Sequence, residues 1–121
     1  ARRRGVAMSQ DQGVQFSLAD LQTGLEAAEL MVARAAWLKE QAVLGSKARY
    51  TREAAMAKLF ATEQARQITQ RAVHLVGEAG LHGEGGIERM MRDARVTTIF
   101  EGTSEIQRVV IARIVLEAFA G

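Results

Sequence analysis

The sequence has no cysteine and no proline among its 121 residues, and each absence narrows the possible structures. Without cysteine, neither a disulfide framework nor a zinc–thiolate site can form. Without proline, no residue forces a kink in a helix. The residues that dominate instead, among them alanine, leucine, glutamate, arginine and glutamine, lose little side-chain freedom in a helix. We therefore expect an all-α protein without a sheet, folded as one domain with one buried core.

Long apolar runs and a strong charge of one sign are also missing. No run approaches the roughly 20 apolar residues that cross a bilayer, so we expect no membrane span. The formal net charge is only +2, and its positive residues gather in Arg2-Arg3-Arg4 and at Lys47 and Arg49 without interleaved aromatic residues. We therefore expect no nucleic-acid binding. His74 and His82 have no carboxylates at matching spacing, so we expect no metal site.

Apolar residues repeat three and four positions apart over long stretches, which is typical of helices that bury one face. This pattern predicts helices over residues 12–42 and 51–76, a short helix over 87–94, and a last helix that starts after Thr103 and continues to Phe119. The expected core face of the first helix consists of Val14, Leu18, Leu21, Leu25, Ala28, Val32 and Ala35. The expected core face of the last helix consists of Val109, Ala112, Leu116 and Phe119. The fold prediction is an up-and-down four-helix bundle.

Two glycine-bearing turns are the candidates for chemistry. The segment from Gly77 to Gly86 holds five glycines in ten residues, and it is either a flexible connection or a place where backbone approaches a ligand. The turn Phe100-Glu101-Gly102-Thr103 precedes the last helix, whose first N–H groups attract anions. Glu101 could act there as a general base if a substrate excluded water. From residue chemistry alone, a solvated glutamate at the start of a helix is the favoured interpretation.

Longer motifs are similar to one known family. The segments Glu88-Arg-Met-Met-Arg-Asp-Ala94, Ile99-Phe-Glu-Gly-Thr-Ser-Glu-Ile-Gln-Arg108 and Ile111-Ala-Arg113 closely resemble the C-terminal signature of acyl-CoA dehydrogenases. Two earlier segments, Gln15-Phe-Ser-Leu-Ala-Asp20 and Glu53-Ala-Ala-Met-Ala-Lys-Leu-Phe60, resemble helices of that family in the same order. The resemblance covers nearly the whole chain. It implies that residues 1–121 form the C-terminal helical bundle of such an enzyme, which follows an N-terminal helical domain and a β domain.

The resemblance also implies roles for individual residues. Glu101 matches the catalytic glutamate that removes the α-proton of an acyl-CoA thioester while the β-hydrogen leaves as hydride to FAD. Its backbone N–H would bind the thioester carbonyl, and Gly102 would let the substrate approach. The positions that match flavin-binding residues are Gln12, His74, Gly77, Glu78, Thr103, Ser104 and Glu105, of which His74, Gly77 and Glu78 would contact the FAD of a neighbouring subunit.

The implied partners are an acyl-CoA substrate, electron-transferring flavoprotein and further copies of the chain in a dimer or tetramer. The implied location is the cytoplasm, or the mitochondrial matrix in a eukaryote. Two departures from the family pattern keep a non-catalytic binding or oligomerisation module open as the alternative. Glu78 would repel a pyrophosphate, and Arg4 takes the place of an aromatic residue. A third hypothesis is an unrelated helical adaptor that binds acidic partners through Arg2-Arg3-Arg4.

Overall fold

The computed structural model describes residues 2–3, 6–77 and 86–120. Its helices are α1 (Gln12–Val43), α2 (Thr51–Val76), α4 (Ile87–Thr97) and α5 (Ser104–Ala120). The strands β1 (Arg2–Arg3) and β2 (Val6–Ala7) pair in an antiparallel manner and are followed by a single 3₁₀ turn, η1 (Met8–Gln10). The all-α prediction is confirmed, and the expectation of no sheet fails only at this pair of two-residue strands, where two extended segments satisfy each other's backbone groups.

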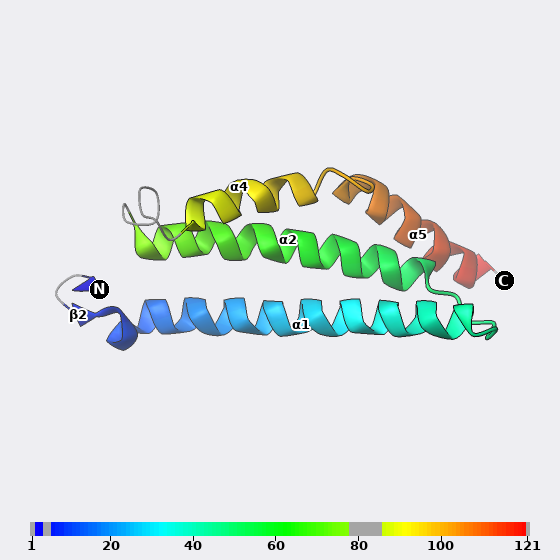
Figure 1. The fold of residues 1–121 in the computed structure, drawn as a ribbon, viewed down its shortest axis with the longest axis horizontal. Helices are drawn as coiled ribbons and strands as arrows, with labels where there is room; N and C mark the ends of the chain where they lie inside the picture. Colours follow the sequence, from blue (N-terminus) through cyan, green and yellow to red (C-terminus); the bar gives the residue numbers. More distant parts are fainter. Residues whose placement is uncertain (1, 4–5, 78–85, 121) are drawn as a thin grey trace.

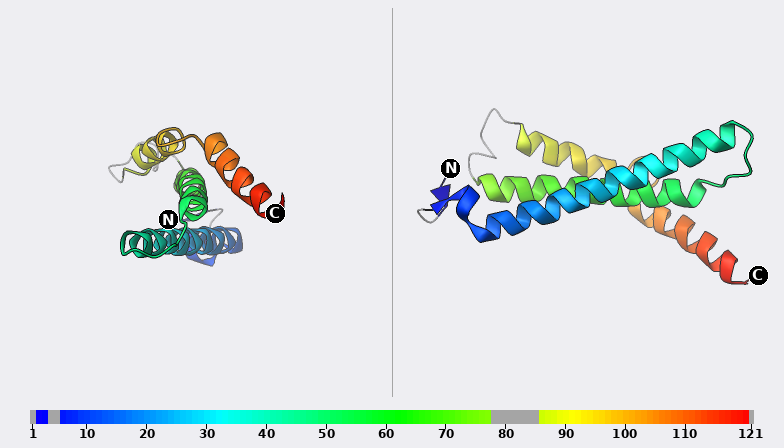
Figure 2. Two further views of the ribbon diagram at one scale, coloured as in Figure 1. Left: turned by 90° about the vertical axis from the view of Figure 1, so that its right-hand side faces the viewer. Right: turned by 90° about the horizontal axis from the view of Figure 1, so that it is seen from below.

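The helix α2 lies at the centre of the fold. It packs against antiparallel α1 on one side and against α4 and α5 on the other (Figure 1). Figures 1 and 2 show that α4 and α5 follow one another along α2, both in the direction opposite to α2. The turn that joins α4 to α5 therefore lies beside the middle of α2 rather than at an end of the bundle.

Small side chains form the interface between α1 and α2. The buried alanines of these helices are Ala28 and Ala35 on α1 and Ala55 and Ala57 on α2, and Ala28 lines the α1–α2 contact together with Ala61 and Ala65. Alanine permits close approach of two helix backbones, and Gly24 extends this effect because a Cβ at that position would collide with the side-chain amide of Gln64. Small residues at these positions thus let α1 and α2 pack closely.

The helix α5 presents a different face to α2 from the one predicted. Val109, Leu116 and Phe119 are 53%, 67% and 85% exposed, so the predicted core face of this helix is wrong. The positions that are buried or half-buried are spaced three and four apart instead and include Ser104, Gln107, Ile111 and Ile114. Because α5 carries apolar residues on all sides, hydrophobic periodicity could not select its buried face. On α1, Val14, Ala28 and Ala35 are buried as predicted, whereas Leu18 and Val32 remain about half exposed.

Candidate active site

The turn between α4 and α5 has an unusual backbone at the predicted base. Glu101 has φ +56° and Gly102 has φ +91°, so two successive residues adopt left-handed conformations. Among the described residues, Glu101 is the one non-glycine with a positive φ. Such a conformation costs about 1–3 kcal/mol and persists where its surroundings hold it in place. The surroundings of this turn therefore hold a strained backbone conformation at some cost in local stability.

Two side chains bind the carbonyl groups of the turn. The Lys58 Nζ atom donates a hydrogen bond of 2.7 Å to the carbonyl oxygen of Gly102. The Gln107 Nε2 atom donates one of 3.1 Å to the carbonyl oxygen of Glu101. A Cβ at Gly102 would lie only 2.6 Å from that Gln107 amide. Glycine is therefore favoured at position 102 by its φ angle, and a larger residue there would displace the Gln107 amide from its hydrogen bond.

The start of α5 is fixed by Thr103 and Ser104 in different ways. The Thr103 hydroxyl accepts a hydrogen bond of 3.3 Å from the backbone N–H of Ile106, so Thr103 is the N-cap. The Ser104 side chain is buried, and its hydroxyl donates a 2.8 Å hydrogen bond to Glu63 on α2. Its backbone N–H donates to the carbonyl of Thr98 at 3.2 Å. Ser104, predicted as a flavin-binding residue, is thus occupied in docking α5 onto α2.

The carboxylates near the turn differ in their surroundings. The hydrogen bond from Ser104, together with the hydrogen bond and charge of Arg66, lowers the pKa of Glu63 although its burial opposes this. The pKa of Glu105 is lowered by its own backbone N–H and by the Thr103 hydroxyl. Both groups are therefore carboxylates at neutral pH. The Glu101 side chain is exposed in the domain, so a bound substrate would have to supply the water exclusion that a general base needs.

The remaining predicted flavin-binding residues lie elsewhere. Gln12 is exposed at the first turn of α1, and His74 and Gly77 are exposed at the end of α2, at the same end of the molecule (Figure 1). An apolar groove of about 530 Å³ lies between the two helices there. His74 is eleven residues beyond Glu63, which corresponds to about 16 Å along α2. The structure thus separates these residues from the Glu101 turn, and Glu78 lies outside the described residues.

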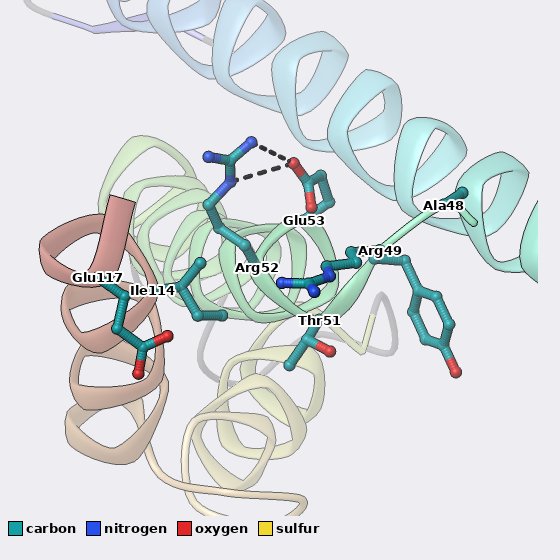
Figure 3. Close-up of a pocket in the computed structure, with 8 residues that line it drawn as sticks. Ala48, Arg49, Thr51, Arg52, Glu53, Ile114 and Glu117 are labelled. Carbon is teal, nitrogen blue, oxygen red and sulfur yellow. Dashed lines mark hydrogen bonds and ion pairs between the residues drawn. The ribbon is translucent and has the colours of Figure 1, made fainter. Parts of the chain in front are cut away.

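A hollow of about 600 Å³ opens at the opposite end of α2 (Figure 3). It is lined by residues of the α1–α2 connection and of α5, among them Arg49, Arg52, Glu53, Ile114 and Glu117. Burial would raise the pKa of Glu53, but the hydrogen bonds and charge of Arg52 outweigh it and lower the pKa. This hollow contains none of the predicted site residues, and of its two arginines Arg52 is paired with Glu53. It is not a candidate for the chemistry at Glu101.

The described residues contain no helix that is both long and apolar enough to span a membrane. Within the same part of the chain, no three histidine, aspartate or glutamate side chains gather in a way that would hold a metal ion.

The supporting residues Lys58, Glu63 and Gln107 were not predicted from the sequence. One signal was available, because Lys58 and Glu63 are charged residues next to the alanine-rich inner face of the second helix. Periodicity alone assigns such residues to the solvated flank of a helix. Their partners are 44 and 41 residues away in the chain, which no local pattern specifies.

The chain is similar to known proteins over nearly its whole length. Residues 1–116 match the family model described as acyl-CoA dehydrogenase, C-terminal domain. The mitochondrial short-chain specific acyl-CoA dehydrogenase of Sus scrofa is 47% identical over 118 residues, which are 98% of this chain and 28% of that protein. The chain therefore spans less than a third of the length of this relative.

Solved structures give the same result. Butyryl-CoA dehydrogenase from Megasphaera elsdenii matches with a TM-score of 0.88 and 34% identity over 96% of this chain and 29% of that one. A structure described as electron transferring flavoprotein of Acidaminococcus fermentans matches with a TM-score of 0.88 and 38% identity over 96% and 29%. The FAD complex of PigA matches with a TM-score of 0.86 and 31% identity over 95% and 29%.

Proposed function

Because this chain belongs to the acyl-CoA dehydrogenase family, whose C-terminal domain it matches, we propose that it forms part of an enzyme that oxidises an acyl-CoA thioester to the 2,3-enoyl-CoA. The observation that carries the proposal is Glu101, a strained carboxylate-bearing residue within the family signature at the start of α5. Residues 1–121 form the C-terminal helical domain of that enzyme. The other half of its active site belongs to the N-terminal helical and β domains.

Glu101 is the base in this proposal. Its carboxylate removes the α-proton of the thioester, and the charge that develops moves to the thioester carbonyl oxygen. The backbone N–H of Glu101 has no backbone acceptor among the described residues, and it donates to this oxygen. One donor of this kind is worth about 3 kcal/mol in comparable oxyanion sites. Gly102 leaves space for the thioester beside the backbone.

FAD fits the polar residues that this domain offers. When bound, it accepts the β-hydrogen of the substrate as hydride. The Glu105 carboxylate is exposed and ionised, which suits it to accept hydrogen bonds from ribose hydroxyls. Thr103 stands beside it at the helix N-terminus, and Ser104 contributes by fixing the helix. His74 and Gly77 serve the FAD of a neighbouring subunit, which agrees with their distance from the Glu101 turn, and Gln12 is a further flavin-binding residue.

The further partners of the enzyme belong to the same proposal. Electron-transferring flavoprotein would serve as the electron acceptor of the complete enzyme, which would work as a homodimer or tetramer. Exposed apolar residues on α5, including Val109, Leu116 and Phe119, are suited to contacts with other domains or subunits. The location is the cytoplasm, or the mitochondrial matrix if the source is a eukaryote, as for the pig relative.

The test is anaerobic reduction of the complete, FAD-loaded protein by butyryl-CoA, with octanoyl-CoA as a longer substrate. Glu101→Gln should retain FAD and lose reduction by at least about 100-fold, the contribution of a general base. Glu117→Gln, which changes an exposed glutamate on the same helix, is the matched control and should keep the wild-type rate. Rapid bleaching of the flavin in the Glu101→Gln protein would overturn the assignment.

A non-catalytic oligomerisation module is the second candidate, favoured by the exposed apolar residues of α5. It predicts a complete protein that is colourless, remains dimeric and binds no acyl-CoA. A yellow preparation whose flavin is reduced by acyl-CoA eliminates this candidate.

A further inference from the structure

Two side-chain hydrogen bonds connect α2 to the rest of the described chain, and both end in the turn before α5 or in its first residue. Lys58 donates to the Gly102 carbonyl, and Ser104 donates to Glu63. The other side-chain hydrogen bonds of the described residues join positions no more than six residues apart, such as Gln107 and Glu101. The side-chain hydrogen bonds from α2 to other elements are therefore concentrated at the residues around Glu101, and its ion pair with α1 joins Glu53 to Arg34.

Lys58 is an unusual residue for such a contact. It is half-buried, and the ion pairs of the described residues do not include it. Partial burial of an ammonium group against a neutral carbonyl has a desolvation cost that an ion pair would offset better. An alanine or methionine would pack in this helix face without that cost. We therefore attribute the contact to the backbone conformation that it fixes in the turn before α5, and not to the stability that it adds.

The two contacted carbonyls belong to successive peptide groups. Gln107 holds the peptide group that links Glu101 to Gly102, and Lys58 holds the one that links Gly102 to Thr103. Fixing two successive peptide planes removes the torsional freedom of the backbone between them. The torsions between these two planes are those of Gly102, and the first plane is also the peptide group that directly follows the Glu101 Cα atom. Holding it fixes one of the two peptide groups that flank Glu101 and so limits the direction of the Glu101 side chain.

We propose that Lys58 and Gln107 are positioning residues for Glu101: by binding the two carbonyl groups that follow its Cα atom, they hold its carboxylate at the substrate α-carbon. This inference rests on the proposed role of Glu101 as the base. Ser104 and Glu63 have the separate role of docking α5, so loss of Lys58 or Gln107 leaves the helix in place and loosens the turn alone.

The experiment compares Lys58→Met, Lys58→Arg and Gln107→Met in the complete, FAD-loaded protein. Methionine keeps the length of glutamine and most of the unbranched stem of lysine and removes the donor, whereas arginine keeps a cationic donor. The matched control is Lys39→Met, at an exposed position on α1. The measurements are FAD content, thermal stability, the Kd for butyryl-CoA and the rate constant of flavin reduction at saturating butyryl-CoA.

Both methionine variants should retain FAD and bind butyryl-CoA within about threefold of wild type. Their reduction rates should fall roughly 10- to 100-fold, since a misplacement of about 1 Å costs up to that factor. Lys58→Arg should recover part of the rate. A second readout is exchange of the α-hydrogens of acetyl-CoA in D₂O, which needs the base but no hydride transfer because acetyl-CoA has no β-carbon. This exchange should slow in parallel with flavin reduction.

Each alternative outcome has a distinct meaning. Wild-type reduction rates in both methionine variants, with Glu101→Gln inactive, would overturn the positioning role and leave the proposed function intact. Loss of FAD or of thermal stability in Lys58→Met, with a wild-type rate in Gln107→Met, would make Lys58 a structural residue and also overturn it. Full activity of Glu101→Gln would remove the proposed function itself.

Discussion

Replacing Gly102 with alanine tests the geometry of the turn most directly, because the chain contains a matched control. Gly45, in the connection between α1 and α2, has φ +92°, and Gly102 has φ +91°. A Cβ at Gly45 would meet no atom within 4 Å, whereas one at Gly102 would lie 2.6 Å from the Gln107 amide. Both alanine substitutions place an L-residue in a left-handed conformation. Only the one at Gly102 also brings the new Cβ against the Gln107 amide.

The magnitudes follow from this difference. Gly45→Ala should destabilise the domain by about 1–2 kcal/mol, the cost of a left-handed conformation for an L-residue. Gly102→Ala carries the same cost and displaces the amide of Gln107 from the Glu101 carbonyl, which adds about 1 kcal/mol for the lost hydrogen bond. The double variant Gly102→Ala/Gln107→Ala should be less destabilised than the sum of its single variants, since the collision and the hydrogen bond are then lost only once.

The assay is urea unfolding of the complete protein, read by hydrogen exchange in peptides from α2, so that the signal reports this domain. Flavin reduction by butyryl-CoA is measured in parallel and should fall in Gly102→Ala but not in Gly45→Ala. Equal destabilisation by the two alanine substitutions, with unchanged reduction rates, would refute the argument that Gln107 and Gly102 fit together at this turn.

Three further predictions concern the start of α5. Thr103→Ala should destabilise the helix start by about 1 kcal/mol through loss of the N-cap, and Thr103→Ser should restore it, as measured by exchange of the Ile106 amide. Ser104→Ala should cost about 1.5–3 kcal/mol in urea unfolding, because it removes a hydrogen bond to a charged carboxylate. Because the pKa of Glu63 is lowered in the folded protein, its carboxylate stabilises the fold above the ordinary glutamate value of 4.5, and this stabilisation is lost as the pH falls through the folded value. In Glu63→Gln, the free energy of unfolding should therefore depend less on pH in this acidic range. An unchanged pH dependence in the variant contradicts this prediction.

The helices were predictable because their signals are long and repeated. The predicted ranges 12–42 and 51–76 agree with Gln12–Val43 and Thr51–Val76, and the last helix begins after Thr103 as expected. The short helix was predicted to end at residue 94 but continues to Thr97. The buried face of α5 was not predictable in this way, because a helix that is apolar on all sides has no preferred face until its partners are known.

The candidate site likewise contains residues that a local motif predicts and residues that it does not. Glu101, Gly102 and Thr103 stand in one continuous motif, so the sequence alone points to them. The contacts of Lys58 and Glu63 depend on the register between α2 and a turn more than forty residues away, which is set by packing rather than by any local pattern. Ser104 illustrates the consequence, because the family resemblance implied that it binds flavin, whereas its hydroxyl donates a hydrogen bond to Glu63 on α2.

The position of the turn explains how one domain can carry a strained residue reliably. Since α4 and α5 follow one another along α2, their junction lies against the middle of a 26-residue helix rather than at a frayed end (Figure 1). Lys58 and Glu63 are five residues apart on that helix, and their hydrogen bonds hold the junction at two points, at Gly102 and at Ser104, while the Glu101 side chain remains exposed. The central helix thus fixes the backbone of the turn without covering the carboxylate. Under the proposed function, this domain holds the base in place, and the substrate and flavin reach it from outside the domain.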